Sequence, residues 1–201
     1  VNVKIIKKNK IQIKDKKEIF FTNNIIRIKR FYLGGGIKRS FEILFKKYCF
    51  VDIKVKPNDV IFDVGSNVGE FSSYFKNKNC VIYSFEPDPE VNKIQKLNLS
   101  KMNNFYLSNL VLSNKKSNLE FYLDSNNASS SLINKSSKKI NIYSERLDNF
   151  IHSNKIKNIR ILKIDAEGAE PEVLEGIGDK FKLIDYITID CSAERNNKTP
   201  I

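Results

Sequence analysis

Residues 60–70 read Val-Ile-Phe-Asp-Val-Gly-Ser-Asn-Val-Gly-Glu, and this segment constrains the fold more than any other part of the chain. An apolar run reaches Phe62 and ends at Asp63. Gly65 and Gly69 then bracket a tight turn into an amphipathic stretch. The pattern predicts a buried strand that enters a helix through a loop with few side chains, where a ligand can lie directly on the backbone N–H groups.

A second apolar run, Cys80 to Phe85, follows and ends at Glu86. An acidic residue about 20 positions after a glycine loop, at the tip of the next strand, is placed to bind the two hydroxyls of a ribose. Strand, glycine turn, helix, strand and acid together predict a nucleoside-binding half-domain, with Glu86 on the ribose.

The glycine spacing bears on which nucleoside is bound. A dinucleotide fingerprint is G-x-G-x-x-G, whose middle glycine makes room for a pyrophosphate, whereas Gly65 and Gly69 are separated by three residues and Asn67 takes the middle position. Asp63 would also lie near a bound phosphate, which is unfavourable. A carboxylate there suits S-adenosylmethionine, whose ammonium Asp63 is expected to face. A nicotinamide-dependent oxidoreductase remains the alternative for this loop.

Four further segments follow along the chain. They are Ser84–Pro87, Arg146–Asp148, the run Leu-Lys-Ile-Asp-Ala-Glu-Gly-Ala-Glu over 162–170, and Val-Leu-Glu-Gly over 173–176. Together with residues 63–71 they resemble the motifs of the FkbM family of S-adenosylmethionine-dependent methyltransferases, and the similarity extends from about Arg30 to Asp190.

The resemblance implies a Rossmann-like class I methyltransferase sheet with helices on both faces. It implies S-adenosylmethionine as cofactor and methylation of a hydroxyl on a sugar, a glycan or a small metabolite. A non-catalytic or decayed nucleoside-binding module is a further alternative. The Ser- and Asn-rich segment 124–139 is expected to be either a lid over the site or a disordered insertion. The resemblance favours the lid, because the family has a Ser-Ser-Leu element there, here Ser130-Ser131-Leu132.

In this interpretation the glycine loop lies against the methionine end of the cofactor. The residues expected there are Gly65, Ser66, Asn67 and Gly69. Asn109, at the inner end of the third strand, is expected either to touch the adenine or simply to turn the chain.

Asp165 and Glu167 are the predicted catalytic pair, because they follow the fourth strand in the crevice where open α/β sheets bind ligands. One of them is expected to take the proton of the acceptor hydroxyl. The alternative is helix N-terminal charge, the role assigned to Glu170 and Glu172. Lys163 lies two residues before Asp165 on the same strand face, so it is predicted to pair with that carboxylate and hold it ionised.

No metal site is predicted. Asp190 could join Asp165 as a ligand, but the surrounding pattern of a metal site is absent. His152, the only histidine, is assigned a structural role, on a helix face that packs.

Composition limits the class of protein. The chain has 201 residues and 41% hydrophobic residues, which fits one globular domain. It has no run of about 18 apolar residues and no signal-peptide core at the N-terminus. Three scattered cysteines in apolar surroundings predict reduced core thiols and a cytoplasmic protein.

The formal charge of +12 comes from 29 lysines and only 6 arginines. Nucleic-acid surfaces depend on arginine for bidentate contacts and stacking, so no nucleic-acid partner is expected. Attraction to an anionic substrate or membrane surface stays open.

Strands that alternate with helices predict a parallel sheet. Residues 1–50 are expected to form a small N-terminal β/α decoration, and residues 51–201 the S-adenosylmethionine-binding domain. The family's last strand pair is expected to be missing, which leaves strand 184–190 as a sheet edge open to self-association. The other expected elements are strands within 1–28, a flexible break at 30–36, a helix from a Ser40 cap to Tyr48, helices at 70–75, 91–102, 147–153 and 170–177, two adjacent strands at 104–112 and 118–123, and strands at 140–146 and 159–164.

Overall fold

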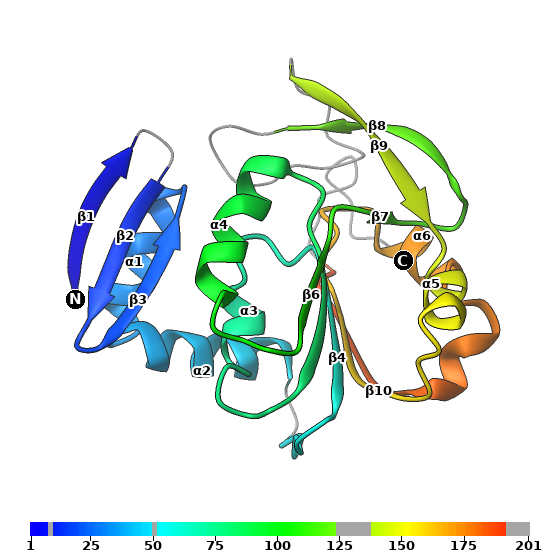
Figure 1. The fold of residues 1–201 in the computed structure, drawn as a ribbon, viewed down its shortest axis with the longest axis horizontal. Helices are drawn as coiled ribbons and strands as arrows, with labels where there is room; N and C mark the ends of the chain where they lie inside the picture. Colours follow the sequence, from blue (N-terminus) through cyan, green and yellow to red (C-terminus); the bar gives the residue numbers. More distant parts are fainter. Residues whose placement is uncertain (8–9, 50–51, 124–137, 192–201) are drawn as a thin grey trace.

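A computed structural model describes residues 1–7, 10–49, 52–123 and 138–191 (Figure 1). Its centre is a five-stranded parallel sheet in the order β11-β10-β4-β5-β6. The strands are β4 (Val60–Val64), β5 (Val81–Phe85), β6 (Phe105–Ser108), β10 (Ile159–Ile164) and β11 (Ile184–Ile189). This is the predicted Rossmann-like sheet flanked by helices.

One face of the sheet is covered by α2 (Ile37–Tyr48) and α3 (Glu70–Ser73). Their apolar side chains, including Phe45 and Phe71, pack on Ile61, Ile82 and Ile161 from three neighbouring strands. Because side chains alternate along a strand, the neighbours of these isoleucines point to the opposite face.

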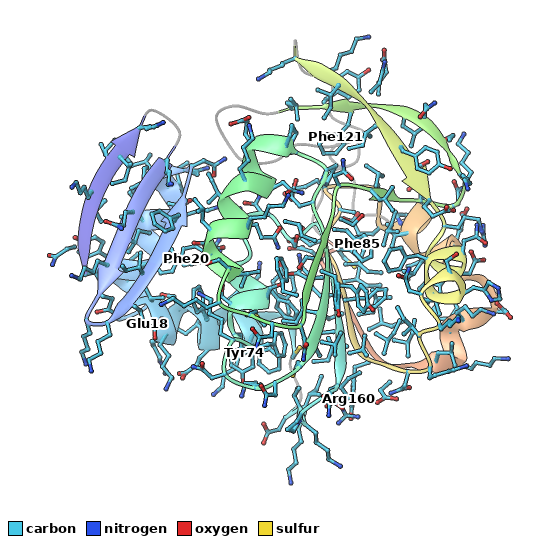
Figure 2. The ribbon with its side chains drawn as sticks, in the orientation of Figure 1. Glu18, Phe20, Tyr74, Phe85, Phe121 and Arg160 are labelled. Atoms are coloured by element: carbon cyan, nitrogen blue, oxygen red, sulfur yellow. The ribbon has the colours of Figure 1, made fainter. Side chains whose placement is uncertain are left out.

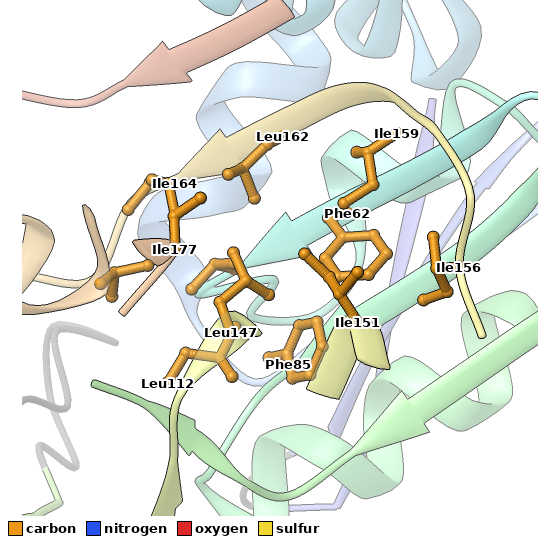
Figure 3. Close-up of a cluster of buried hydrophobic side chains, with 12 residues drawn as sticks. Phe62, Phe85, Leu112, Leu147, Ile151, Ile156, Ile159, Leu162, Ile164 and Ile177 are labelled. Carbon is orange, nitrogen blue, oxygen red and sulfur yellow. The ribbon is translucent and has the colours of Figure 1, made fainter. Parts of the chain in front are cut away.

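The opposite face packs against α5 (Leu147–Ser153) and α6 (Glu170–Glu175) (Figure 3). Phe62 and Leu162 project from the sheet and meet Leu147 and Ile151 of α5 and Val173 of α6. Burial on both faces explains why these strands read as continuous apolar runs rather than alternating ones.

The N-terminal residues form a separate antiparallel sheet, β1 (Asn2–Lys7), β2 (Lys10–Asp15) and β3 (Glu18–Thr22), with α1 (Ile25–Leu33) packed against it. Phe20, Phe31 and Phe41 form its aromatic centre, with ring centroids 5.2–6.0 Å apart. Two ion pairs fasten this unit to the core, because Arg27 and Arg30 each lie 2.5 Å from Glu70 of α3.

A third sheet, in the order β7-β9-β8, lies beyond the end of β6 (Figure 1). Its strands are β7 (Val111–Leu112), β8 (Ser117–Tyr122) and β9 (Lys139–Glu145), while α4 (Pro89–Leu99) connects β5 to β6 and a 3-10 helix, η1 (Gly178–Leu183), precedes β11. No helix in the described ranges is long and apolar enough to cross a membrane.

Several local predictions are wrong. The break expected at 30–36 is shorter than predicted, because α1 continues to Leu33 and only residues 34–36 are non-helical. Asn24 caps the start of this helix by accepting from the Ile26 N–H at 2.7 Å. Ser40 is not a cap but lies inside α2, where its hydroxyl donates to the Gly36 carbonyl.

The strands predicted at 104–112 and 118–123 are not neighbours. The first divides into β6, in the central sheet, and β7, and β9 lies between β7 and β8. Cys49 and Cys80 are buried, as predicted, but Cys191 is exposed. His152 is exposed as well, not packed.

The predicted lid, with Ser130-Ser131-Leu132, lies outside the described residues except for its last two positions, 138 and 139. Within the described part of the chain, β11 forms one edge of the central sheet. Self-association through that edge, and the domain boundary at residue 50, stay predictions.

Candidate functional site

A groove opens at the carboxyl ends of β4, β5 and β10, where parallel α/β sheets bind ligands. It is lined by Val64, Gly65, Asn67, Phe85, Glu86, Pro87, Val91, Leu110, Val111, Leu112, Phe121, Asp165, Ala166, Glu167 and Ala169. Figure 2 labels Phe85 on the central sheet and Phe121 on the small upper sheet, so two sheets contribute to its walls. The groove is narrow, with a volume of about 60 Å³.

Gly65 is required by the neighbouring strand. It has φ of +70°, and a Cβ at this position would lie 1.7 Å from the carbonyl oxygen of Asp165. The loop and the end of β10 therefore touch backbone to backbone. A side chain here would force the two motif segments apart before it reached any ligand.

The N–H groups of the glycine loop are already used. Gly65 and Ser66 both donate to the carbonyl of Phe85, at 3.0 and 3.1 Å, and Gly69 donates to the carbonyl of Ser66. The Val68 N–H is bonded to the side chain of Asn67. A ligand that lies on this loop would therefore meet N–H groups that already donate within the protein.

Three of the predicted cofactor residues do not line the groove. The Ser66 hydroxyl donates to Gln95 of α4 at 3.0 Å. A Cβ on Gly69 would lie 3.0 Å from side-chain atoms of Gln95 and Leu99, so this glycine lets α4 pack closely. Asn109 is exposed, and the next residue, Leu110, lines the groove instead.

Glu86 is a buried carboxylate in the groove wall. One oxygen accepts the Asn67 N–H at 2.8 Å and the other accepts the Asp88 N–H at 2.9 Å. Burial raises the pKa of Glu86 to about 7, although the two N–H groups act in the opposite direction. The site thus holds a carboxyl group that titrates near neutral pH.

A buried lysine connects the two motif segments. The Lys163 ammonium lies 3.2 Å from Asp63 and 3.6 Å from Asp165, and donates to the carbonyls of Val64 and Gly65. Burial lowers the pKa of Lys163, but the two carboxylates outweigh it and hold the pKa above its ordinary value. The predicted pairing of Lys163 with Asp165 is confirmed.

Asp63 faces inward, away from the groove. Its carboxylate is fully buried, between the Lys163 ammonium and the Ser72 hydroxyl, which donates to it at 2.6 Å. Direct contact with the ammonium of a ligand would require these two groups to move.

Tyr48, at the end of α2, is a member of the site that the sequence did not indicate. Its hydroxyl donates to Asp165 at 2.6 Å, and the Lys163 ammonium lies 5.3 Å from its ring centroid. Burial, reinforced by the charge of Asp165, raises the pKa of Tyr48 far above its ordinary value, so it remains a donor. In the sequence Tyr48 is only one apolar position of an amphipathic helix.

Asp165 and Glu167 are brought together at the groove, where both are half-buried. Tyr48 and Lys163 contact the Asp165 oxygen Oδ2, and within the described residues no hydrogen bond to Oδ1 is found. Glu167 has φ of +51°, a conformation that is unusual for a non-glycine residue and is concentrated at functional sites.

Glu170 holds the loop that carries this pair. Glu170 and Glu172 both lie in the first turn of α6, as predicted. Glu170 is buried and accepts hydrogen bonds from the N–H groups of Ala166 at 2.6 Å and Gly168 at 3.2 Å. Its contacts are therefore those of a structural residue.

Sequence comparison relates the chain to a protein family and to a named relative. The sequence model of the Methyltransferase FkbM domain matches residues 63–198, which is more than half of the chain. Methyltransferase 1 of Beauveria bassiana (strain ARSEF 2860) is 26% identical over 192 residues, covering 79% of this chain and 76% of that relative. The matched range includes the glycine loop, Glu86 and the Lys163 network.

Proposed function

The chain belongs to the FkbM methyltransferase family, and on that premise we propose that it transfers a methyl group from S-adenosylmethionine to a hydroxyl of a small molecule or glycan. The observation that carries the proposal is Glu86, a buried carboxylate in the groove at the carboxyl ends of the strands.

Glu86 has the acceptor capacity that a ribose needs. A carboxylate has about four lone-pair positions, and backbone N–H groups use one on each oxygen. The remaining positions can accept the two ribose hydroxyls. The ligand would thereby stabilise a charge whose burial is otherwise unfavourable.

The rest of the groove suits an adenosyl group. Leu110, Val111 and Phe121 supply an apolar wall for a flat base. Pockets for ligands of this size usually hold about 300–1,000 Å³, so binding must widen the groove described here. Phe121 lies on the small sheet rather than the central one, and movement there would open the site without disturbing β4 or β5.

Gly65, Asn67 and Asp165 would then face the methionine end. Because the Lys163 ammonium and the Ser72 hydroxyl already contact Asp63, the ligand ammonium could reach Asp63 only if these two groups moved. Ser66 and Gly69 contribute by holding the loop on α4, and Asn109 contributes no described contact to the groove.

Methyl transfer from a sulfonium is an in-line displacement in which the protein mainly positions the acceptor. When bound, S-adenosylmethionine supplies the activated methyl group. A hydroxyl acceptor also loses a proton, and Asp165 or Glu167 is placed to take it at the groove. Tyr48 and Lys163 orient Asp165, and Glu170 fixes the loop that carries Glu167.

Calorimetry with S-adenosylhomocysteine and with NAD tests the cofactor. We expect binding of the first and none of the second. Glu86→Ala should weaken binding by roughly 2–3 kcal/mol, the scale of hydrogen bonds to a charged group. Glu90→Ala, at an exposed position of α4, is the matched control and should bind normally. Preferential binding of NAD would favour an oxidoreductase.

Methyl transfer from labelled S-adenosylmethionine to a panel of sugars and alcohols tests the catalytic pair. Asp165→Asn or Glu167→Gln should keep S-adenosylhomocysteine affinity within about tenfold while turnover falls by roughly 10²–10⁴. Both substitutions preserve shape. Near-normal turnover in both variants would assign these residues the alternative role of charges that stabilise a helix N-terminus. If the unmodified protein binds the cofactor but methylates none of the acceptors, a non-catalytic module would be favoured.

A further inference from the structure

The outer side of α1 exposes large apolar side chains. Leu33 is 88% exposed, Ile25 67%, Ile26 59% and Tyr32 56%. Single exposed apolar residues need no explanation, whereas a contiguous group marks a contact surface.

Helix geometry makes this group contiguous. Ile25, Lys29 and Leu33 are spaced by four residues and form one stripe, with Ile26 and Arg30 in the next. Phe31 points the other way and is fully buried in the N-terminal aromatic centre. The helix thus has an apolar inner face against the protein and a second apolar face toward solvent.

Strand β1 extends the exposed surface. Val3 pairs with Ile13 of β2 and Ile5 with Ile11, so these β1 residues share the sheet face on which Ile13 is buried. Ile5 is nevertheless 68% exposed. The Tyr32 hydroxyl donates to the Val1 carbonyl at 2.9 Å, which joins the end of α1 to the start of β1.

We call the set Val3, Ile5, Ile25, Ile26, Tyr32 and Leu33 the N-terminal apolar surface. Figure 1 shows β1 as the outermost strand of its sheet, with α1 behind that sheet, far from the groove at the carboxyl ends of the central strands.

The charges around this surface are of one sign. Neither β1 nor α1 contains an acidic residue. On α1, Arg27 and Arg30 are paired with Glu70, whereas Lys29 makes no ion pair within the described part of the chain. Lys4 and Lys7 of β1 pair with Gln12 and Lys10, so they lie on the other face of the sheet. Helix α1 thus combines exposed aliphatic side chains with three basic residues and no acidic residue of its own.

We propose that the N-terminal apolar surface docks on an anionic phospholipid membrane. Isoleucine and leucine side chains of an interfacial helix enter the boundary between headgroups and acyl chains. Lys29, in the middle of the stripe, can lay its aliphatic stem along them and place its ammonium among phosphates. An anionic lipid surface matches the all-basic charge of α1.

Sedimentation with lipid vesicles tests the proposal with the whole chain. Vesicles containing phosphatidylserine should bind the protein, and vesicles of phosphatidylcholine alone should bind it much less. Binding should weaken with salt. Leu33→Ser should lower the partition coefficient by about tenfold or more, from the lost burial of one leucine, and Lys29→Gln by about fivefold.

Matched controls lie on α4, where Leu97 and Lys96 are also exposed. Leu97→Ser and Lys96→Gln should bind vesicles normally, and circular dichroism should show that all four variants are folded. Equal binding to both kinds of vesicle, no binding at low salt, or no effect of Leu33→Ser would overturn the proposal. A dimer that Leu33→Ser dissociates, in a protein that ignores vesicles, would assign the surface to a second copy of the chain.

Discussion

The affinity for S-adenosylhomocysteine is expected to increase as the pH rises through the titration of Glu86. The pKa of this carboxyl is about 7 because burial disfavours its charge. Ribose hydroxyls donate hydrogen bonds, so they bind the ionised form better than the protonated form. Ligand binding should therefore lower the pKa and release a proton.

The magnitude follows from the fraction ionised. One pH unit below the pKa about one carboxyl in eleven is charged, and one unit above about ten in eleven, so affinity should change by on the order of tenfold across this window. Folding stability has the opposite dependence. The folded pKa is raised from 4.5, so the contribution of Glu86 to stability is complete below about 4.5 and is lost as the pH rises to about 7.

Calorimetry across this range, in buffers with different ionisation enthalpies, measures both the affinity and the released proton. Glu86→Gln should bind more weakly and with little pH dependence. His152→Asn is the matched control, because this histidine is exposed and does not line the groove, and its replacement should leave the profile unchanged. A flat profile in the unmodified protein, or an unchanged profile in Glu86→Gln, would refute the ribose assignment.

Three further perturbations follow from the contacts. Gly65→Ala should lower the free energy of unfolding by about 3 kcal/mol or more in denaturant titration, since the added Cβ meets the Asp165 carbonyl. Gly35→Ala, also at positive φ but with its Cβ at an ordinary contact distance of 3.9 Å from the Arg39 side chain, should lower it by only about 1 kcal/mol, and equal losses would contradict the clash. Lys163→Met should lower the free energy of unfolding by about 3–5 kcal/mol, because it leaves buried carboxylates unpaired. Lys180→Met, which removes a surface ion pair with Asp179, should lower it by less than about 1 kcal/mol, and an equally small loss for Lys163→Met would mean that the buried network does not stabilise the fold. If the β11 edge self-associates, sedimentation should show a dimer that Ile187→Lys dissociates, and a concentration-independent monomer would exclude it.

The sequence predicts the central sheet well because each of its strands carries its own signal. The helix at 147–153 and the strand at 159–164 are found at the predicted residues, since their apolar patterns are set by burial on the sheet. The small upper sheet was predicted poorly, because β7 has two residues and its pairing with β9 depends on a segment distant in sequence.

Side-chain roles in the site were less predictable than its position. Period-2 alternation placed Lys163 beside Asp165, a relation within one strand. Its stronger contact, Asp63, is a cross-strand neighbour in the register of β10 with β4. That relation depends on strand order, which an apolar pattern does not specify. Tyr48 was missed for the same reason, because it reaches Asp165 from a helix that precedes both strands.

Gly65 and Lys163 together explain why the two motif segments occur in one chain. Each segment contributes a carboxylate, Asp63 or Asp165, that is unfavourable to bury alone. The lysine supplies the counter-charge to both, and the missing side chain at residue 65 lets the strand ends approach until the Lys163 ammonium also reaches the Val64 and Gly65 carbonyls. The glycine loop therefore serves the site by closing the fold around this ion network, which leaves Glu86 on one side, and Asp165 with Glu167 on the other, as the carboxylates that line the groove.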